Sequence, residues 1–356
     1  MKGGDTMLKA EPKTNYRFFT AANGYTGFRS YFDSVFSPTE YTRIFVLKGG
    51  PGTGKSTLLR NIAAALEDSC DRCELILCSS DPHSLDGIIL QRGGRRIGIL
   101  DGTAPHERDA VLPGAVSELI NLGDGWNAEE LKQHRKEIEE LDKIRISYYR
   151  SAYEKLALIG KIDGYIMAEV KGAFDITAAG RYAGEVISNI GAPNGERDIR
   201  LISAVCSRGR LTLPTLGKIS TATIHVGGSR YAARLFLTFL ASEAKRSGIR
   251  HIYIPEPERD EYCEALLFPD ASLSIVRESV GAYDVCADDY IVTPCAGSNL
   301  YRHFADELAT HATEALAKAS ENHFELEKIY SAAMDYTVCD RICASLTERC
   351  SALLSD

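Results

Sequence analysis

One stretch of nine residues constrains the fold of this chain more than any other. It reads GGPGTGKST and runs from Gly49 to Thr57. Directly before it, residues 44–47 form an apolar run that is typical of a buried strand. Directly after it, apolar residues recur at helical spacing, at Leu58, Leu59, Ile62, Ala63 and Leu66. The sequence therefore predicts a strand, a glycine-rich loop and a helix in succession, which is a building unit of α/β folds.

The spacing of this stretch matches the pattern G-x-x-x-x-G-K-[ST], in which backbone N–H groups and a helix N-terminus surround phosphate groups. Glycines allow the loop to bend and to approach the phosphates closely. In this pattern Lys55 reaches the β- and γ-phosphates, Ser56 ligates Mg²⁺, and Thr57 lies near the α-phosphate. We therefore expect ATP and Mg²⁺ to bind here. The expected binding residues are Gly49, Gly50, Pro51, Gly52, Thr53, Gly54, Lys55, Ser56 and Thr57.

A bound magnesium ion also needs a carboxylate, normally at the end of a strand next to the strand that precedes the loop. The apolar run 97–100 ends in Asp101, which is the main candidate. Asp81 follows a second apolar run and would hold the metal if that run lay beside residues 44–47. The sequence alone does not decide whether Asp101, Asp81 or both ligate the metal together with Ser56.

Asp86 is a weaker metal candidate, because residues 84–87 read SLDG and resemble a turn or the start of a helix. The loop after Asp101 reads GTAPHERD and is rich in polar groups. Within it, Glu107 or His106 would position an attacking water, and Arg108 would neutralise developing charge. Surface turns have the same composition, and we favour that interpretation for Arg108 and Asp109. The expected catalytic residues are Lys55, Asp101, His106 and Glu107.

The two halves of the chain pass through the same order of elements. Residues 44–50 are echoed by residues 222–228, and an apolar helix follows each. Further matches pair residues 75–78 with 252–255 and residues 99–100 with 275–276. We infer a tandem duplication with a boundary in the turn-rich segment 189–196.

The predicted fold is α/β, with two tandem α-β-α domains and mainly parallel sheets. The first domain spans residues 1–190 with a helical appendage at about 127–188, and the second spans 198–356 with an appendage at about 301–354. Asn127 can cap the first appendage, and the charged face at 132–143 either is solvated or binds a protein partner.

The second domain lacks the charged groups of the first. On an ungapped comparison from Gly227, Lys55, Ser56 and Thr57 correspond to Ala233, Arg234 and Leu235, and Asp101 corresponds to Arg277. We therefore expect a degenerate loop there and a second half that supports or gates the first without hydrolysing ATP.

Residues 47–59 and 99–106 together resemble P-loop NTPases. More specifically, the chain resembles an uncharacterised group of bacterial tandem P-loop ATPases. In that group an F-x-x-A-x-x-x-x-G segment precedes the loop and a D-G-T-A-P-H stretch follows it; here these are residues 19–27 and 101–106. The resemblance implies ATP binding and supplies no substrate.

The composition of the chain also bears on nucleic-acid binding, membrane insertion and cellular location. A net charge of -8 argues against an extended nucleic-acid-binding face, although Arg92, Arg95 and Arg96 form a local basic patch. No run approaches the roughly 20 apolar residues that span a bilayer, and the N-terminus lacks the apolar core of a signal peptide, so we expect a cytoplasmic protein. The ten cysteines are scattered, as is typical of buried thiols in a reducing compartment.

Three functions fit these patterns. The leading one is a Mg²⁺-dependent ATPase with one active site. The second is a small-molecule or nucleotide kinase, in which residues 81–83 and 101–108 bind the acceptor and Arg92, Arg95 and Arg96 form a lid. The third is a non-catalytic ATP sensor or scaffold. ATP is favoured over GTP because the sequence contains no N-K-x-D stretch of the kind that selects guanine.

Overall fold

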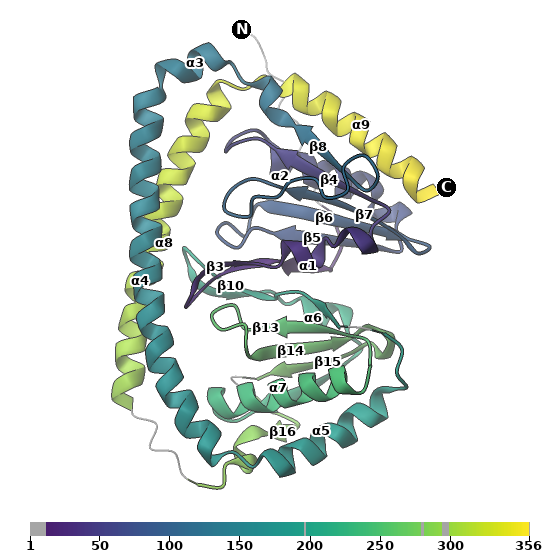
Figure 1. Ribbon diagram of the computed structural model, residues 1–356, viewed down its shortest axis with the longest axis vertical. Coiled ribbons are helices and arrows are strands. Elements are labelled where there is room, and N and C mark those ends of the chain that lie inside the picture. The colour runs from purple at the N-terminus through teal and green to yellow at the C-terminus, as the bar shows by residue number, and fades with distance from the viewer. Residues whose placement is uncertain (1–11, 196, 279–280, 294–298, 356) are drawn as a thin grey trace. The chain divides into compact units, whose positions relative to one another are not determined.

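The computed structural model describes residues 12–195, 197–278, 281–293 and 299–355 (Figure 1). Most of the N-terminal stretch considered above, and residue 196 of the predicted boundary, lie outside these ranges. The chain forms two compact units. Unit 1 consists of Met1–Phe18, Phe36–Arg150 and Ala315–Asp356, and unit 2 consists of Phe19–Val35 and Ser151–Glu314.

Unit 1 is built on a six-stranded mixed sheet. In order across the sheet, its strands are β1 (Arg17–Phe19), β5 (Arg72–Leu77), β6 (Leu85–Arg92), β7 (Arg95–Asp101), β4 (Arg43–Lys48) and β8 (Ser117–Asn121). Its helices include α2 (Lys55–Leu66), α3 (Ala128–Gln133), α9 (Tyr336–Ser355), the first part of α4 (Arg135–Ala173) and the last part of α8 (Asn299–Ala332).

Strand β4 is central to unit 1 because it lies between β7 and β8 and is parallel to both. Its four apolar residues, 44–47, are completely buried, as their uninterrupted hydrophobic run predicts. Helix α2 follows β4 and buries the five positions predicted from the sequence: Leu58, Leu59, Ile62, Ala63 and Leu66. The predicted strand, loop and helix are therefore confirmed, and the loop joins the end of β4 to the start of α2.

Unit 2 is built on a second six-stranded mixed sheet. In order, its strands are β16 (Val285–Cys286), β12 (Ala222–Gly227), β15 (Leu273–Arg277), β14 (Cys263–Phe268), β13 (His251–Pro255) and β9 (Arg197–Ile199). Two hairpins, β2 (Ala21–Gly24) with β3 (Gly27–Ser30) and β10 (Ser203–Cys206) with β11 (Gly209–Thr212), also belong to it. Its other helices are α1 (Phe32–Val35), α5 (Ile176–Ile190), α6 (Thr215–Ile219) and α7 (Arg230–Arg246).

The two sheets share one topology. In unit 2, β12 lies between β15 and β16 and is parallel to both, as β4 is to β7 and β8. In unit 2, β14 is antiparallel to β13 and β15, as β6 is to β5 and β7. A register shift even occurs at the same place, after Ile76 in β5 and after Ile254 in β13. The repeated order of elements found in the sequence therefore corresponds to a repeated arrangement of strands.

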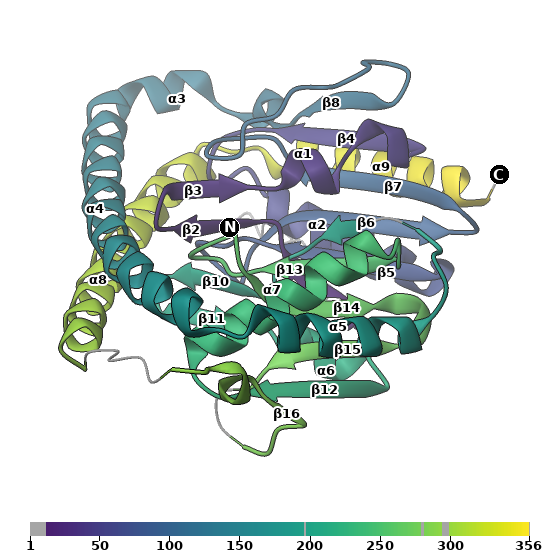
Figure 2. The same cartoon turned by 60° about the horizontal axis from the view of Figure 1, so that its bottom comes forward.

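The long helices α4 and α8 each run from one unit into the other. Residues 135–150 of α4 belong to unit 1 and the rest to unit 2, whereas α8 begins in unit 2 and ends in unit 1. As a result, α9 contacts α2 in unit 1. In unit 2, α5 contacts α7 (Figure 2).

This arrangement differs from the predicted division into residues 1–190 and 198–356. The predicted appendages are helical, but residues 176–190 pack in unit 2 and residues 336–355 pack in unit 1. Sequence order could not show this, because a continuous helix such as α4 gives no sign of where it leaves one core and enters another. Among the described residues, no helix combines the length and hydropathy needed to cross a membrane.

The contact of α9 with α2 gives a test of this assignment. Leu346 of α9 is 1% exposed, so Leu346→Ala should lower the free energy of unfolding by roughly 2–5 kcal/mol. Leu119→Ala is the matched control, since Leu119 also lies in unit 1 but is 49% exposed, and it should cost less than about 1 kcal/mol. Urea denaturation measures both. Equal small effects would contradict the placement of α9 in the core of unit 1.

Candidate active site

The loop between β4 and α2, residues 49–54, is named the glycine loop below. Gly52 and Gly54 have φ angles of 71° and 82°, a left-handed conformation that favours glycine. Gly54 caps α2 without any side-chain hydrogen bond to the helix. The first N–H groups of a helix have no partner within the helix. The start of α2 therefore presents backbone donors and the positive end of the helix dipole at the glycine loop.

Lys55, the first residue of α2, folds back over the glycine loop. Its ammonium donates hydrogen bonds to the carbonyl oxygens of Gly49, at 2.6 Å, and Gly50, at 2.7 Å. The same nitrogen lies 3.6 Å from Oδ2 of Asp101, and both side chains are only 11% exposed. The positive charge of Lys55 is therefore held between the start of the glycine loop and Asp101, largely shielded from water.

Asp101 stands at the end of β7, and the register pairs it with Leu47 of β4. The predicted adjacency of this carboxylate to the strand before the loop is therefore present. Its Oδ1 accepts hydrogen bonds from the backbone N–H of Thr103, at 2.9 Å, and from the Thr103 hydroxyl, at 2.6 Å. Thr103 thus orients the carboxylate so that Oδ2 faces Lys55.

Asp101 belongs to a cluster of buried ligand groups that includes Asp86 and His106. One ligand atom from each of the three side chains lies within 4.8 Å of the others. Burial raises the pKa of Asp86 to about 6; the nearby His106 lowers it and the Asp101 carboxylate raises it. Two carboxylates and an imidazole at this spacing form a donor set able to hold a divalent cation.

The turn or helix start predicted for residues 84–87 was wrong. Strand β6 begins at Leu85 and includes Asp86. Antiparallel pairing of β6 with β7 places Gly87 opposite Leu100, which brings the neighbouring Asp86 beside Asp101. The apolar run after Asp86 was the signal that could have shown a strand.

Asp81 lies outside this cluster. The sheet order separates β5 from β4 by two strands, β6 and β7, so the condition under which Asp81 would replace Asp101 is not met. Its carboxylate accepts hydrogen bonds from the Ser84 hydroxyl, at 2.6 Å, and from the backbone N–H of His83. Ser84 is followed by Leu85, whose N–H donates to the hydroxyl of Ser56 at 2.9 Å. The turn that contains Asp81 is therefore adjacent to the start of α2.

The loop after Asp101 places its polar residues in different surroundings. His106 is buried in the cluster, whereas Glu107 is exposed. Arg108 is buried and donates a hydrogen bond of 2.6 Å to the carbonyl of Phe36. Asp109 is exposed and lies 3.2 Å from the ammonium of Lys48. The surface position that we favoured holds for Asp109, whereas Arg108 is buried.

The basic patch forms the hairpin between β6 and β7. Arg95 donates to the carbonyl of Leu353 at 3.1 Å, and Arg96 donates to the carboxylate of Glu40 at 2.6 Å. These two arginines are therefore used in packing within unit 1.

The corner between α8 and α9 contacts the glycine loop, which the sequence did not indicate. The carbonyl of Gly52 accepts hydrogen bonds from the Tyr336 hydroxyl, at 2.8 Å, and the Ser331 hydroxyl, at 3.3 Å. A Cβ atom on Gly52 would lie 2.7 Å from the carbonyl oxygen of Glu327. Glycine is therefore required at position 52 by both its φ angle and this close approach.

Trp126 covers the other side of the glycine loop. A Cβ atom on Gly50 would lie 3.1 Å from its indole ring. The indole packs against Tyr330 of α8, with ring centroids 5.6 Å apart. The backbone N–H of Asn127 bonds the carbonyl of Ala333 at 2.8 Å and ties this corner to α8. Segments about 200 residues apart in sequence thus surround the loop within unit 1.

Unit 2 has a different structure at the corresponding place. Its strand-to-helix connection contains only two residues, Gly228 and Ser229, where the glycine loop has six. Ser229 caps α7 by accepting a hydrogen bond from the N–H of Ala232. The first residue of α7 is Arg230, so this residue, and not Ala233, is the counterpart of Lys55; the ungapped comparison was wrong here because it ignored the shorter loop. The register pairs Arg277 with Val226 as it pairs Asp101 with Leu47, in line with the predicted correspondence.

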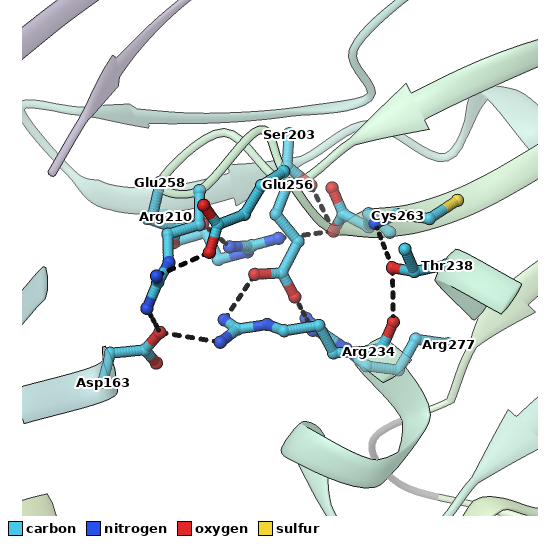
Figure 3. Close-up of polar contacts among 12 residues, drawn as sticks. Asp163, Ser203, Arg210, Arg234, Thr238, Glu256, Glu258, Cys263 and Arg277 are labelled. Atoms are coloured by element: carbon cyan, nitrogen blue, oxygen red, sulfur yellow. Dashed lines mark hydrogen bonds and ion pairs between the residues drawn. The ribbon is translucent and has the colours of Figure 1, made fainter. Parts of the chain in front are cut away.

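Buried ion pairs fill the corresponding region of unit 2 (Figure 3). Arg277 and Arg234 each lie 2.5 Å from a different oxygen of Glu256, and Arg234 also lies 2.7 Å from Asp163. Arg234 and Glu256 are completely buried. Burial alone would raise the pKa of Glu256, but Arg234 and Arg277 outweigh it and lower the pKa to about 2. Unit 2 therefore neutralises its buried carboxylates with its own cations.

Comparison with protein-family models, with curated proteins and with solved structures finds no match to this chain.

The buried ion pairs predict a large effect of removing one partner. Arg234→Met leaves Glu256 with one cation and Asp163 with less compensation, so the free energy of unfolding should fall by roughly 3–5 kcal/mol. Arg246→Met is the matched control on the same helix, because the Arg246 side chain is 76% exposed; it should change stability by less than about 1 kcal/mol. Both are measured by urea denaturation, and similar small losses would show that the pairs in unit 2 are not coupled to its folding.

The low pKa of Glu256 also predicts acid sensitivity. A carboxylate whose pKa falls from 4.5 to about 2 on folding stabilises the folded state above pH 4.5, and this contribution disappears as the pH falls toward 2. The wild-type midpoint of thermal unfolding should therefore drop across this interval more steeply than that of Glu256→Gln, which has no such proton to take up. Parallel pH profiles for the two proteins would contradict the prediction.

Proposed function

We propose that this chain is a Mg²⁺-dependent ATPase of the P-loop type, with one nucleotide site, in unit 1. The observation that carries the proposal is the placement of Lys55 between two carbonyls of the glycine loop and the carboxylate of Asp101. An ammonium held in this way can transfer its hydrogen bonds from Gly49 and Gly50 to phosphate oxygens. The uncapped start of α2 supplies backbone donors to the same place.

The donor groups of unit 1 fit a magnesium ion. Ser56 offers a hydroxyl that accepts a hydrogen bond from the N–H of Leu85, and Asp101 and Asp86 offer carboxylate oxygens, which Mg²⁺ prefers. When bound, the ion would neutralise charge on the phosphates and hold their oxygens in position. Thr103 fixes the Asp101 carboxylate, and the His106 imidazole lies beside Asp86 and Asp101.

The structure of unit 2 supports a single site per chain. Its shorter connection lacks the residues that would surround a polyphosphate, and Arg277 stands where unit 1 has Asp101. A guanidinium at that position would repel a metal ion. We therefore assign unit 2 a supporting role without hydrolysis.

The structure offers less support for a kinase. The arginines assigned to a lid, Arg95 and Arg96, are engaged with Leu353 and Glu40. A non-catalytic sensor would bind ATP with negligible turnover, so steady-state phosphate release in the absence of an acceptor separates it from the ATPase that we propose.

Isothermal titration calorimetry with ATP and Mg²⁺ tests the proposal. We expect one nucleotide per chain, and Lys55→Ala should weaken binding at least about tenfold, because a charge-assisted hydrogen bond contributes roughly 1.5–3 kcal/mol. Lys132→Ala, at an exposed lysine of α3, is the control and should bind as the wild type does. Unchanged affinity in Lys55→Ala, or two nucleotides per chain, would refute the assignment of a single site in unit 1.

A further inference from the structure

One face of α8 points at the glycine loop. His323, Glu327 and Ser331 are spaced four residues apart, so their side chains lie on the same face of the helix. Ser331 bonds the carbonyl of Gly52, and the carbonyl of Glu327 is in contact distance of the same glycine. These contacts fix the face of α8 that carries His323 and Glu327 beside the loop.

His323 and Glu327 form a pair on this face. Nε2 of His323 lies 3.6 Å from Oε1 of Glu327, and the side chains are 40% and 39% exposed. They are therefore open to water, unlike the nearly buried Asp101. The charges of Lys55 and Asp81 each act on both members of the pair.

The surroundings of the pair favour a proton acceptor at Glu327. Burial raises the pKa of Glu327, Asp81 raises it further, and Lys55 opposes them. Burial lowers the pKa of His323, and Arg145 and Lys55 lower it further, while Asp81 and Asp142 oppose. A carboxylate with a raised pKa is a stronger base than an ordinary surface glutamate.

The residues first expected to act on the attacking water are less suitable. Glu107 is exposed on the loop after Asp101, and His106 is buried with Asp86 and Asp101 in the ligand cluster. Glu327 lies one helical turn before Ser331, on the face of α8 that contacts Gly52.

We propose that Glu327 is the catalytic base of the ATPase and that His323 is a positioning residue for it. This inference rests on the proposed function. The oxygen of a water held by Glu327 forms a bond to the γ-phosphorus, and the bond from that phosphorus to the β–γ bridging oxygen breaks. The bonding electron pair leaves with ADP, and the proton of the water passes to the Glu327 carboxylate and then to solvent. His323 restricts the orientation of the carboxylate through its contact with Oε1.

Phosphate release and ATP binding, measured on the full chain with Mg²⁺, test this assignment. Glu327→Gln should lower kcat by about 10²- to 10⁴-fold, with the ATP dissociation constant changed less than about threefold. In Glu327→Ala, added sodium formate should restore part of the lost turnover, which a merely structural role would not allow. His323→Gln should lower kcat by a smaller factor. Glu325→Gln is the matched control, because Glu325 lies on the same helix, is 55% exposed and pairs with Lys328; it should behave as the wild type.

The outcomes separate this inference from the proposed function. If Lys55→Ala loses ATP binding while Glu327→Gln hydrolyses ATP at the wild-type rate, the site stands and the role of Glu327 is refuted. If Glu327→Gln loses ATP binding as well, or formate restores nothing to Glu327→Ala, the carboxylate acts in binding or structure and the inference is also refuted. If the wild type does not bind ATP, the proposed function and the role of Glu327 are both refuted.

Discussion

Compensation of buried charge is the constraint on which both units depend. A carboxylate removed from water needs a cation or several hydrogen bonds, or it takes up a proton. In unit 1, Asp86 and Asp101 are buried and close together, and Lys55 is shared with two carbonyls of the glycine loop. In unit 2, Glu256 has two arginines in direct contact. Burial raises the pKa of Asp86, and the metal ion that we propose would add positive charge there, whereas Arg234 and Arg277 already lower the pKa of Glu256.

The path of α4 and α8 determines what surrounds the proposed site. Because α8 begins in unit 2 and ends in unit 1, the residues that contact Gly52 come from the last part of the chain. The glycine loop of the first half of the sequence is therefore held by hydroxyl groups from the end of the second half.

The local part of this structure could be predicted from the sequence, and the non-local part could not. Strand β4 and helix α2 were predictable because hydrophobic periodicity and glycine spacing act over a few residues. The position of Asp101 followed from the same rule applied to the next parallel strand. The contacts of α8 with Gly52 depend on where a continuous helix crosses between cores, and periodicity contains no information on that. The start of β6 at Leu85 was not predicted because residues 84–87 have the composition of a turn.

Three charged residues of unit 2 depend on one another. Leu59 and Arg234 are each the fifth residue of their helix, and both are completely buried. An arginine introduced there alone would be a buried unpaired charge, which costs several kcal/mol. Glu256 supplies its partner, from the position after β13 that corresponds to Cys78 after β5, and Arg277 supplies the second cation where unit 1 has Asp101. An aspartate in place of Arg277 would leave Glu256 with one direct cation and would add a further carboxylate nearby, so the folding of unit 2 opposes that change.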